Sequence, residues 1–332
     1  MRKTLLVIAL ALGAVVPAIV PAFVPAFVPA FAQDAYPAKP VKIIVPFATG
    51  GATDYIARYV GEKLSQRLGR VFIVENRTGA SGSLAADAVA KAPADGYTLF
   101  VSSASYAVLP SLMKLPYDPL RDIAPVVNMV VAPIVVTVNP DVPVKTLQEL
   151  IAYAKANPDK LAYASNGVGS TVHVLTEAFM AKTQTRMVHV PYKGIGPAIA
   201  DLVGGQVQVL LTDAGAVLQF VKAGRVKALA IGGGRRFEQL LPGVPTADEA
   251  GVPGLPLASW QGMFAPRGTP PAIVAKLNAE VNAMFRDKDV IDHFAARFAT
   301  HVGGSPADFV ATVKADIDSW GAIVRNAGIR AE

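Results

Sequence analysis

Short apolar strands alternate with helical patterns along the chain from Val41 onward, and turn residues separate them. This alternation favours an α/β fold with parallel strands, because each helix can carry the chain back to begin a strand beside the previous one. The predicted strands are the apolar runs 41–46, 71–75, 97–102, 134–139, 161–165, 187–191, 207–212 and 226–231.

Helical periodicity fills the intervals between these strands. Apolar residues recur every four positions from Ile56 to Leu68, and Gly69 can end that helix. Thr146 and Glu149 form a capping-box pattern at the start of another helix. The middle of the chain therefore resembles its beginning in construction.

The C-terminal part differs, because it carries two amphipathic helices, predicted to begin near Thr269 and Ser305, and little strand pattern. These helices need a sheet to cover. We therefore expect them to pack on the first part of the chain, which makes the first domain discontinuous and the middle an insertion. The chain would cross between the two domains near 128–138 and 258–266, and such a hinge favours a ligand cleft between them.

The N-terminus has the layout of a secretory signal peptide, in which Arg2 and Lys3 precede a long uncharged apolar stretch. Small residues at Ala30 and Ala32 predict cleavage after Ala32, so that residues 1–32 are removed. A retained membrane anchor is the alternative, since the stretch exceeds the roughly 20 apolar residues that span a bilayer. Prolines at every fourth position oppose a helix there. We therefore expect export.

Composition excludes several classes of function. The 332 residues contain no cysteine, which rules out disulfides, thiolate metal sites and cysteine nucleophiles. The net charge of +6 is not gathered into basic runs, so nucleic acid is not an expected partner. We expect no metal site, because no metal-ligand spacing relates the four histidines, His173, His189, His293 and His301.

Three turns share one form, in which a strand runs into a glycine-rich loop that opens a helix, namely 46–54, 76–82 and 165–171. Such loops leave main-chain N–H groups unpaired at helix N-termini, where the helix dipole also favours negative charge. Each turn can also serve connection geometry alone, but three of them favour an anion site. No P-loop or dinucleotide fingerprint occurs, so a carboxylate is the leading candidate. Lys193 and Arg77 are candidate countercharges or simply exposed surface charges.

Catalytic interpretations have little support. Ser170, His173 and Asp213 could form a triad, but the Gly-x-Ser-x-Gly elbow is missing. The simpler interpretation is that Ser170 caps a helix and His173 lies in its first turn. His189 alternates with valines, as expected of a hydrogen-bonded structural histidine in a strand. Trp260 could line a cleft or fill the core.

Six motifs occur in order along the chain: 41–54, 74–82, 95–99, 190–194, 204–207 and 264–270. Together they resemble the Bug family of periplasmic solute-binding proteins, which are associated with tripartite tricarboxylate transporters and are also known as TctC-like. The resemblance covers essentially the whole chain after the signal peptide. It implies a type II periplasmic-binding-protein fold, in which two α/β lobes joined by two crossover strands close over a ligand, without catalytic activity or a cofactor.

This resemblance and the expected crossings place lobe 1 at 33–133 and 260–332, and lobe 2 at 134–259. The protein is expected to be a periplasmic monomer that captures a small mono- or dicarboxylate, with aromatic acids and amino acids included, and delivers it to a tripartite tricarboxylate-type permease. Signalling to the periplasmic domain of a sensor kinase is an alternative output. A serine hydrolase that uses Ser170 is a further alternative.

The resemblance also implies ligand-binding residues at the loop after the first strand, past the third strand, in the second-lobe glycine-rich loop and at later strand ends. These are Phe47, Thr49, Gly50, Gly51, Asp54, Ser103, Ser105, Ser165, Asn166, Gly169, Ser170, His173, Tyr192, Lys193 and Asp213. The chain departs from the usual family pattern at Thr49, Thr78, Ser81 and Asp213, so the identity of the ligand is not implied.

Overall fold

The structure is a computed structural model that describes residues 36–329. The predicted signal peptide at 1–32 lies outside the described residues. Within the described part, no helix combines the length and the apolar character that a membrane span requires.

Ten strands are described between residues 36 and 329. They are β1 (Val41–Val45), β2 (Phe72–Asn76), β3 (Thr98–Ser103), β4 (Ile123–Val138), β5 (Ala162–Ser165), β6 (Val188–Pro191), β7 (Val209–Asp213), β8 (Lys227–Ile231), β9 (Ala258–Pro266) and β10 (Thr300–Gly303). All eight predicted strands are confirmed, and the run 134–139 proves to be the end of the long strand β4. The first part of β4 and strand β10 had no sequence prediction, and β9 corresponds to the segment 258–266 that was predicted only as a crossing between domains.

The strands pair in the order β2-β1-β3-β9-β4-β7-β5-β6, and β8 and β10 also pair with β4. The expected parallel pairing holds for β1 with β2 and β3, and for β5 with β6 and β7. All the described pairings of β4 and β9 are antiparallel. The sheets are therefore mixed, because these two strands carry the chain out of one group of strands and back again.

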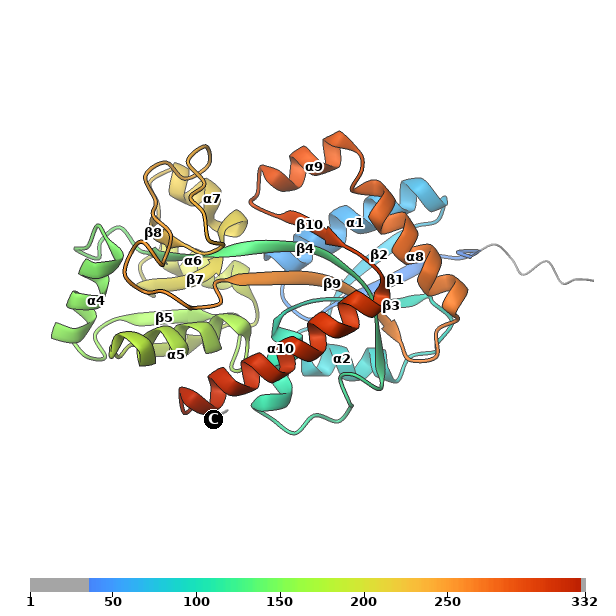
Figure 1. The fold of residues 1–332 in the computed structure, drawn as a ribbon, viewed down its shortest axis with the longest axis horizontal. Helices are drawn as coiled ribbons and strands as arrows, with labels where there is room; N and C mark the ends of the chain where they lie inside the picture. The colour runs from blue at the N-terminus through green and yellow to red at the C-terminus, as the bar shows by residue number, and fades with distance from the viewer. Residues whose placement is uncertain (1–35, 330–332) are drawn as a thin grey trace, which may run out of the picture. The chain divides into compact units, whose positions relative to one another are not determined.

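Strands β4 and β9 run side by side between the two groups of strands (Figure 1). They pair with each other as far as Pro133 and Ala258. From Ile134 onward, β4 pairs with β7 and β8 instead. The two crossover strands thus lie where the sequence predicted the chain to cross.

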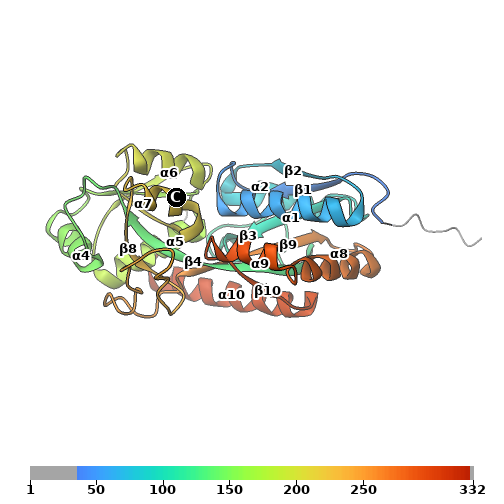
Figure 2. The same ribbon diagram turned by 90° about the horizontal axis from the view of Figure 1, so that it is seen from above.

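The described helices connect and cover these strands. They are α1 (Ala52–Leu68), α2 (Ser83–Ala90), α3 (Ser105–Val108), α4 (Leu147–Ala156), α5 (Thr171–Thr183), α6 (Ile195–Val203), α7 (Ala214–Lys222), α8 (Pro271–Met284), α9 (Lys288–Ala295) and α10 (Pro306–Asn326). Helices α1, α8 and α9 share one buried cluster with the first group of strands, whereas α2, α3 and α10 belong to another (Figures 1 and 2). The C-terminal helices therefore pack on the first part of the chain, as predicted.

Local signals explain several helix ends. Gly69 ends α1 in the left-handed conformation, with φ of 68°, and its N–H donates to Ser65 O. A capping box opens α10, because the Ser305 hydroxyl accepts from Asp308 N–H and the Asp308 carboxylate accepts from Ser305 N–H. Helix α8 begins at Pro271, with Pro270 as its N-cap in place of Thr269, and α9 had no sequence prediction.

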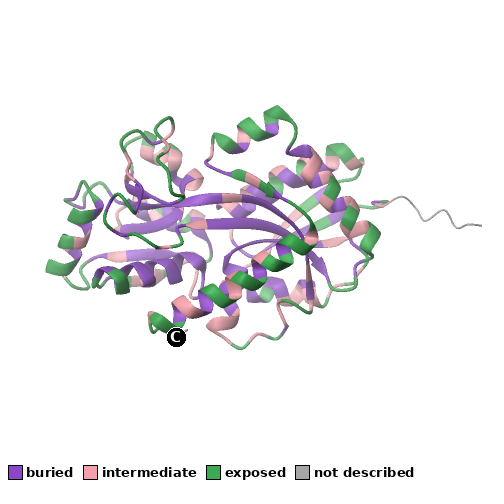
Figure 3. Cartoon of the chain, viewed as in Figure 1, coloured by how far each residue is buried: buried purple, intermediate pink, exposed green. Residues whose placement is uncertain are grey.

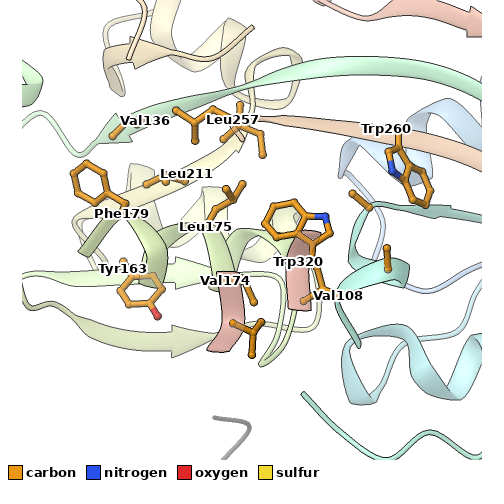
Figure 4. Packing of buried hydrophobic residues seen from close by; sticks show 14 of the residues in the cluster. Val108, Val136, Tyr163, Val174, Leu175, Phe179, Leu211, Leu257, Trp260 and Trp320 are labelled. Carbon is orange, nitrogen blue, oxygen red and sulfur yellow. The ribbon is translucent and has the colours of Figure 1, made fainter. Parts of the chain in front are cut away.

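Buried side chains follow the strands and the inner faces of the helices (Figure 3). Trp320 of α10 lies in the same buried cluster as Val174 and Leu175 of α5 (Figure 4). The last helix therefore packs against α5, a helix of the second half, as well as against the first group of strands.

The structure decides between the two interpretations of Trp260, which could line a cleft or fill the core. It is 5% exposed and packs edge-on against Phe309, with ring centroids 5.1 Å apart. Its indole N–H donates to the Asp316 carboxylate at 2.6 Å. Trp260 fills the core, because the side chain points to α10 and does not line the cavity described below.

Candidate functional site

A small cavity lies where loops from the first group of strands meet loops from the second. We call it the central cavity. It is lined by Phe47, Gly51, Ala52, Thr53, Asp54, Ser103, Ser105, Ile134, Asn166, Thr171, Val172, Ile195, Asp213 and Ser259. Its free volume is 30 Å³. No lysine or arginine of the described residues is among this lining.

Besides the short helix α3, which begins at Ser105, four longer helices begin at this cavity. Gly51 is the N-cap of α1 and Asp213 is the N-cap of α7, while Thr171 and Ile195 are the first residues of α5 and α6. Each helix start directs main-chain N–H groups and the positive end of a helix dipole toward the cavity. The cavity is therefore suited to an anion although no basic side chain lines it.

Unpaired polar atoms also gather here. Within the described residues, Asn166 Oδ1 and Asp213 Oδ1 are buried without a hydrogen-bond partner, and both residues line the cavity. The Gln261 amide nitrogen is also buried and unpartnered, although its Oε1 accepts from the Thr53 hydroxyl at 2.8 Å. Buried polar groups normally find partners, so this concentration indicates a place for a polar ligand or water.

The two acidic residues of the cavity differ in environment. Asp54 is already satisfied, because its carboxylate accepts from Gly50 N–H, the Arg58 guanidinium and the Asn76 amide. Desolvation by burial raises the pKa of Asp213 to about 7, and this outweighs the opposing effect of a hydrogen bond from its own main-chain N–H. A neutral Asp213 carboxyl can donate a hydrogen bond to an anion instead of repelling it.

Direct hydrogen bonds connect the loops across the cavity. The Ser105 hydroxyl accepts from Thr171 N–H at 3.0 Å and lies 2.9 Å from the Thr171 hydroxyl. Ala48 N–H donates to Lys193 O at 3.2 Å. The Ser81 hydroxyl donates to a main-chain oxygen in the second-lobe loop, that of Val168. The two sides of the cavity are thus in contact in this structure.

Seven of the predicted ligand-binding residues line the central cavity: Phe47, Gly51, Asp54, Ser103, Ser105, Asn166 and Asp213. Gly50 lines an adjoining space of 460 Å³, the side cavity, which reaches α7 and α9. Tyr192 and Lys193 line a third space of 330 Å³, the loop cavity, between the glycine-rich loops of the two halves. Thr49 lies exposed in the first loop.

The remaining predicted residues lie beneath the second-lobe loop. The Ser165 hydroxyl is 2.7 Å from His189 Nε2, and Gly169 N–H donates to His173 Nδ1 at 3.1 Å. The two histidine rings stack with centroids 4.2 Å apart, and burial lowers the pKa of each to about 4. These neutral histidines thus support the loop through hydrogen bonds. His189 is a hydrogen-bonded histidine in a strand, as the sequence predicted.

Ser170 is fully buried and caps α5, because its hydroxyl accepts from His173 N–H at 3.2 Å. The simpler sequence interpretation of Ser170 and His173 is therefore confirmed. Asp213 lies at the cavity and not against His173, whose Nδ1 already accepts from Gly169. These three residues do not form the hydrolase triad.

Sequence reasoning missed half of the lining: Ala52, Thr53, Ile134, Thr171, Val172, Ile195 and Ser259. Thr53 and Thr171 stand within the quoted glycine-rich turns, so position at a helix start was a usable signal. Ile195 follows Gly194 in the same way. Ile134 and Ser259 come from the crossover strands, and only the folded arrangement brings them here. The described residues contain no group of three or more His, Cys, Asp or Glu side chains that could hold a metal ion.

Comparison with known proteins agrees with this architecture. The chain is 41% identical over 300 residues to protein BugT of Bordetella pertussis, which covers 90% of this chain and 92% of that protein. The structure of Rhodopseudomonas palustris Rpa4515 with adipate superposes with a TM-score of 0.86 at 37% identity, covering 89% of this chain and 99% of that one. MatC from the same species with bound malate gives 0.82 at 35% identity, covering 87% and 100%.

These likenesses confirm the expected fold, two α/β lobes of the type II periplasmic-binding-protein class. Residues 56–329 match the model of the tripartite tricarboxylate transporter family receptor. This family consists of solute-binding receptors, so the hydrolase alternative is wrong. The chain belongs to the tripartite tricarboxylate transporter family of periplasmic solute-binding receptors, together with the Bug proteins.

Proposed function

We propose that this receptor captures a small carboxylate in the central cavity. The observation that carries the proposal is the convergence of four helix N-termini on one cavity that also holds unpaired polar atoms. Main-chain N–H groups and hydroxyls can share the ligand's charge without an arginine clamp. The relatives with adipate and with malate support the same ligand class.

The proposed lobes are 33–133 with 260–332, and 134–259. The change of partner along β4 between Pro133 and Ile134 supports the first boundary. Ligand binding would favour the closed arrangement, because groups from both lobes contribute to the cavity, and β4 and β9 would act as the hinge.

Calorimetry and thermal-shift assays against mono- and dicarboxylates, with the matching neutral amides as controls, test this proposal. We expect carboxylates to release heat and raise the Tm. Thr53→Val removes a hydroxyl at the cavity and should weaken binding. Thr183→Val removes a buried hydroxyl that bonds Phe179 O at the far end of α5, so it should leave the affinity unchanged. Binding of the amides but not the acids contradicts the proposal.

Three further parts of the proposal concern the cell. Residues 1–32 are removed on export, which N-terminal sequencing of periplasmic protein checks. The receptor acts as a monomer. It passes its ligand to a tripartite tricarboxylate-type permease, and the family description supports this partner. A pull-down with and without ligand distinguishes the permease from the alternative partner, a sensor-kinase periplasmic domain, and size-exclusion chromatography with light scattering tests the monomer.

A further inference from the structure

The central cavity is too small to hold a whole dicarboxylic acid. Its free volume of 30 Å³ corresponds to about two water molecules, because a buried water needs roughly 10–15 Å³ on this measure. One carboxylate group fills such a space. In the arrangement of the lobes seen here, the rest of a ligand must extend into an adjoining cavity.

Two cavities adjoin the central one. The side cavity shares Gly51, Ala52 and Asp213 with it, and the loop cavity shares Phe47 and Asn166. The side cavity, at 460 Å³, is the larger and lies within the range of about 300–1,000 Å³ typical of ligand pockets. The start of α1 and the start of α7 therefore stand between the proposed head-group site and this larger space.

The walls of the side cavity suit a carbon chain or a ring. Tyr55, Ile56 and Leu218 line it, and Phe294 contributes a further aromatic ring. Ile56 and Phe294 are buried. Among the described residues that line the side cavity, Asp213 is the acidic one, and it lies at the end shared with the central cavity. A carboxylate bound at the other end would therefore meet no acidic side chain.

Arg297 stands on this wall with its charge unpaired. Its guanidinium carbon lies 4.8 Å from the centroid of the Tyr55 ring, and its Nη1 donates to His293 O at 3.3 Å. These contacts hold the side chain half-buried. In the described part of the chain no carboxylate lies within ion-pair distance of it, so most of its five N–H donors remain for an anion. Lys222, which also lines the side cavity, and Lys193 of the loop cavity are, in contrast, exposed.

The neighbouring backbone keeps Arg297 close to the second lobe. Gly215 of α7 packs so tightly against it that a Cβ on that glycine would lie 2.6 Å from Arg297 O. Gly215 is only two residues from Asp213, which lines both cavities. In this arrangement Asp213, at the head-group site, and Arg297 both line the side cavity.

We propose that the side cavity is a distal subsite in which Arg297 binds the second carboxylate of an elongated dicarboxylate, with the chain or ring lying against Tyr55 and Phe294. This inference rests on the proposed function and names its ligand class. Compact acids occupy the head-group site alone and gain nothing from Arg297.

Matched acid pairs test the subsite by calorimetry on protein purified from the periplasm. Adipate and hexanoate share a chain length but differ in the distal carboxylate, as do terephthalate and benzoate, and succinate with butyrate serves as the short pair. In the wild type we expect at least one long diacid to bind about 10-fold or more tighter than its monoacid, the effect of one charge-assisted contact. Arg297→Gln should bring that ratio close to one and change the monoacid affinity little.

Two further variants serve as a charge-matched control and as a second test of the subsite. Arg286→Gln removes the same charge from an exposed arginine outside the three cavities and should preserve the ratio. Ala216→Phe fills the side cavity, so it should weaken long acids and spare succinate. It also tests the proposal independently if Arg297→Gln folds poorly.

The outcomes separate this inference from the proposed function. If short acids bind and long diacids gain nothing over their monoacids, the distal subsite is refuted and the carboxylate receptor stands. A ratio that falls in Lys193→Gln but not in Arg297→Gln places the distal group in the loop cavity and overturns the proposal. If no acid binds, the proposed function itself fails.

Discussion

The Ser105 hydroxyl accepts a hydrogen bond from the main-chain N–H of Thr171 at 3.0 Å, and the two side-chain hydroxyls lie 2.9 Å apart. Ser105 is the first residue of α3 and Thr171 is the first residue of α5, so this contact joins the two proposed lobes at the cavity itself. Both residues are buried. The contact stabilises the arrangement in which the central cavity is closed.

Ser105→Ala should weaken ligand binding about 5- to 30-fold, because it leaves Thr171 N–H unpaired and removes hydrogen bonds worth about 1–2 kcal/mol together. Isothermal calorimetry measures the change. Ser65→Ala is the matched control, since the Ser65 hydroxyl also makes two hydrogen bonds, to Gly61 O and from Phe72 N–H, away from the cavity. The control should lower the Tm without changing the affinity. Equal affinity of Ser105→Ala and wild type contradicts the prediction.

Gly196→Ala should hinder closure. A Cβ at Gly196 would lie 2.5 Å from Thr49 O, a main-chain atom that cannot turn away. Separating the loops costs about 1–3 kcal/mol, as for other overpacked contacts, so we expect affinity to fall about 10-fold while the Tm of the free protein changes little. Small-angle X-ray scattering with ligand should show a larger radius of gyration than for wild type.

Gly204→Ala provides the comparison for that variant, because Gly204 ends the same helix and its Cβ would lie 3.3 Å from Ala200 O, within α6 itself. Closure should be unaffected by it. A Gly196→Ala protein that closes and binds normally shows that the loops do not need this contact.

Asp213→Asn should raise stability above neutral pH. Burial raises the folded-state pKa of Asp213 to about 7 from an ordinary value of 3.8, so between these values the native state holds a proton that the unfolded chain has released. The stability contributed by this group is therefore present below pH 4 and lost as pH rises through 7. The Tm difference, variant minus wild type, should be small at pH 4 and reach a few degrees at pH 8.

The buried histidines do not disturb this comparison. Burial lowers the pKa of His173 and His189 to about 4, so their effect has the opposite sign, with stability lost as pH falls from 6.5 towards 4. Wild type and variant share these groups, and the difference curve isolates Asp213. A Tm difference that does not vary with pH would show that the Asp213 carboxyl titrates normally.

Trp260→Phe should destabilise the protein by about 1–3 kcal/mol, because it removes a hydrogen bond to a half-buried carboxylate. The lost bond is that from the indole N–H to Asp316, whose pKa burial raises. Urea unfolding measures the change. Ligand affinity should be unaltered, because Trp260 packs in the core against Phe309. A large loss of affinity at unchanged stability would place Trp260 in the binding site after all.

Periodicity and turn chemistry were enough to predict the local elements. The apolar repeat from Ile56 to Leu68, closed by Gly69, predicts α1, and the Ser305 cap begins α10 where expected. The first part of β4 was not predicted, because this strand is buried along almost its whole length and shows no alternation between core and solvent. Strand β10 was not predicted either, since it has only four residues and gives little pattern. The motif order also predicted the fold class.

The glycine-rich turns predicted which loops meet at the central cavity. Asn166 and Gly51 line the central cavity as expected, whereas Ser165 and His173 lie beneath it as supports. Which residue of a turn faces the ligand depends on the exact direction of each helix start. That direction is set by packing between strands distant in sequence, so local pattern does not contain it.

The sequence by itself determined the strands, the helix starts that present N–H groups, and the two-lobed family to which the chain belongs. Only the tertiary structure decided that Ser105 meets Thr171, that Asp213 loses its solvation, and that Arg297 borders a cavity shared with Gly51. The physical reason is that periodicity and turn preferences act between near neighbours in the chain, whereas cavities and pKa shifts arise from desolvation by segments far apart in it.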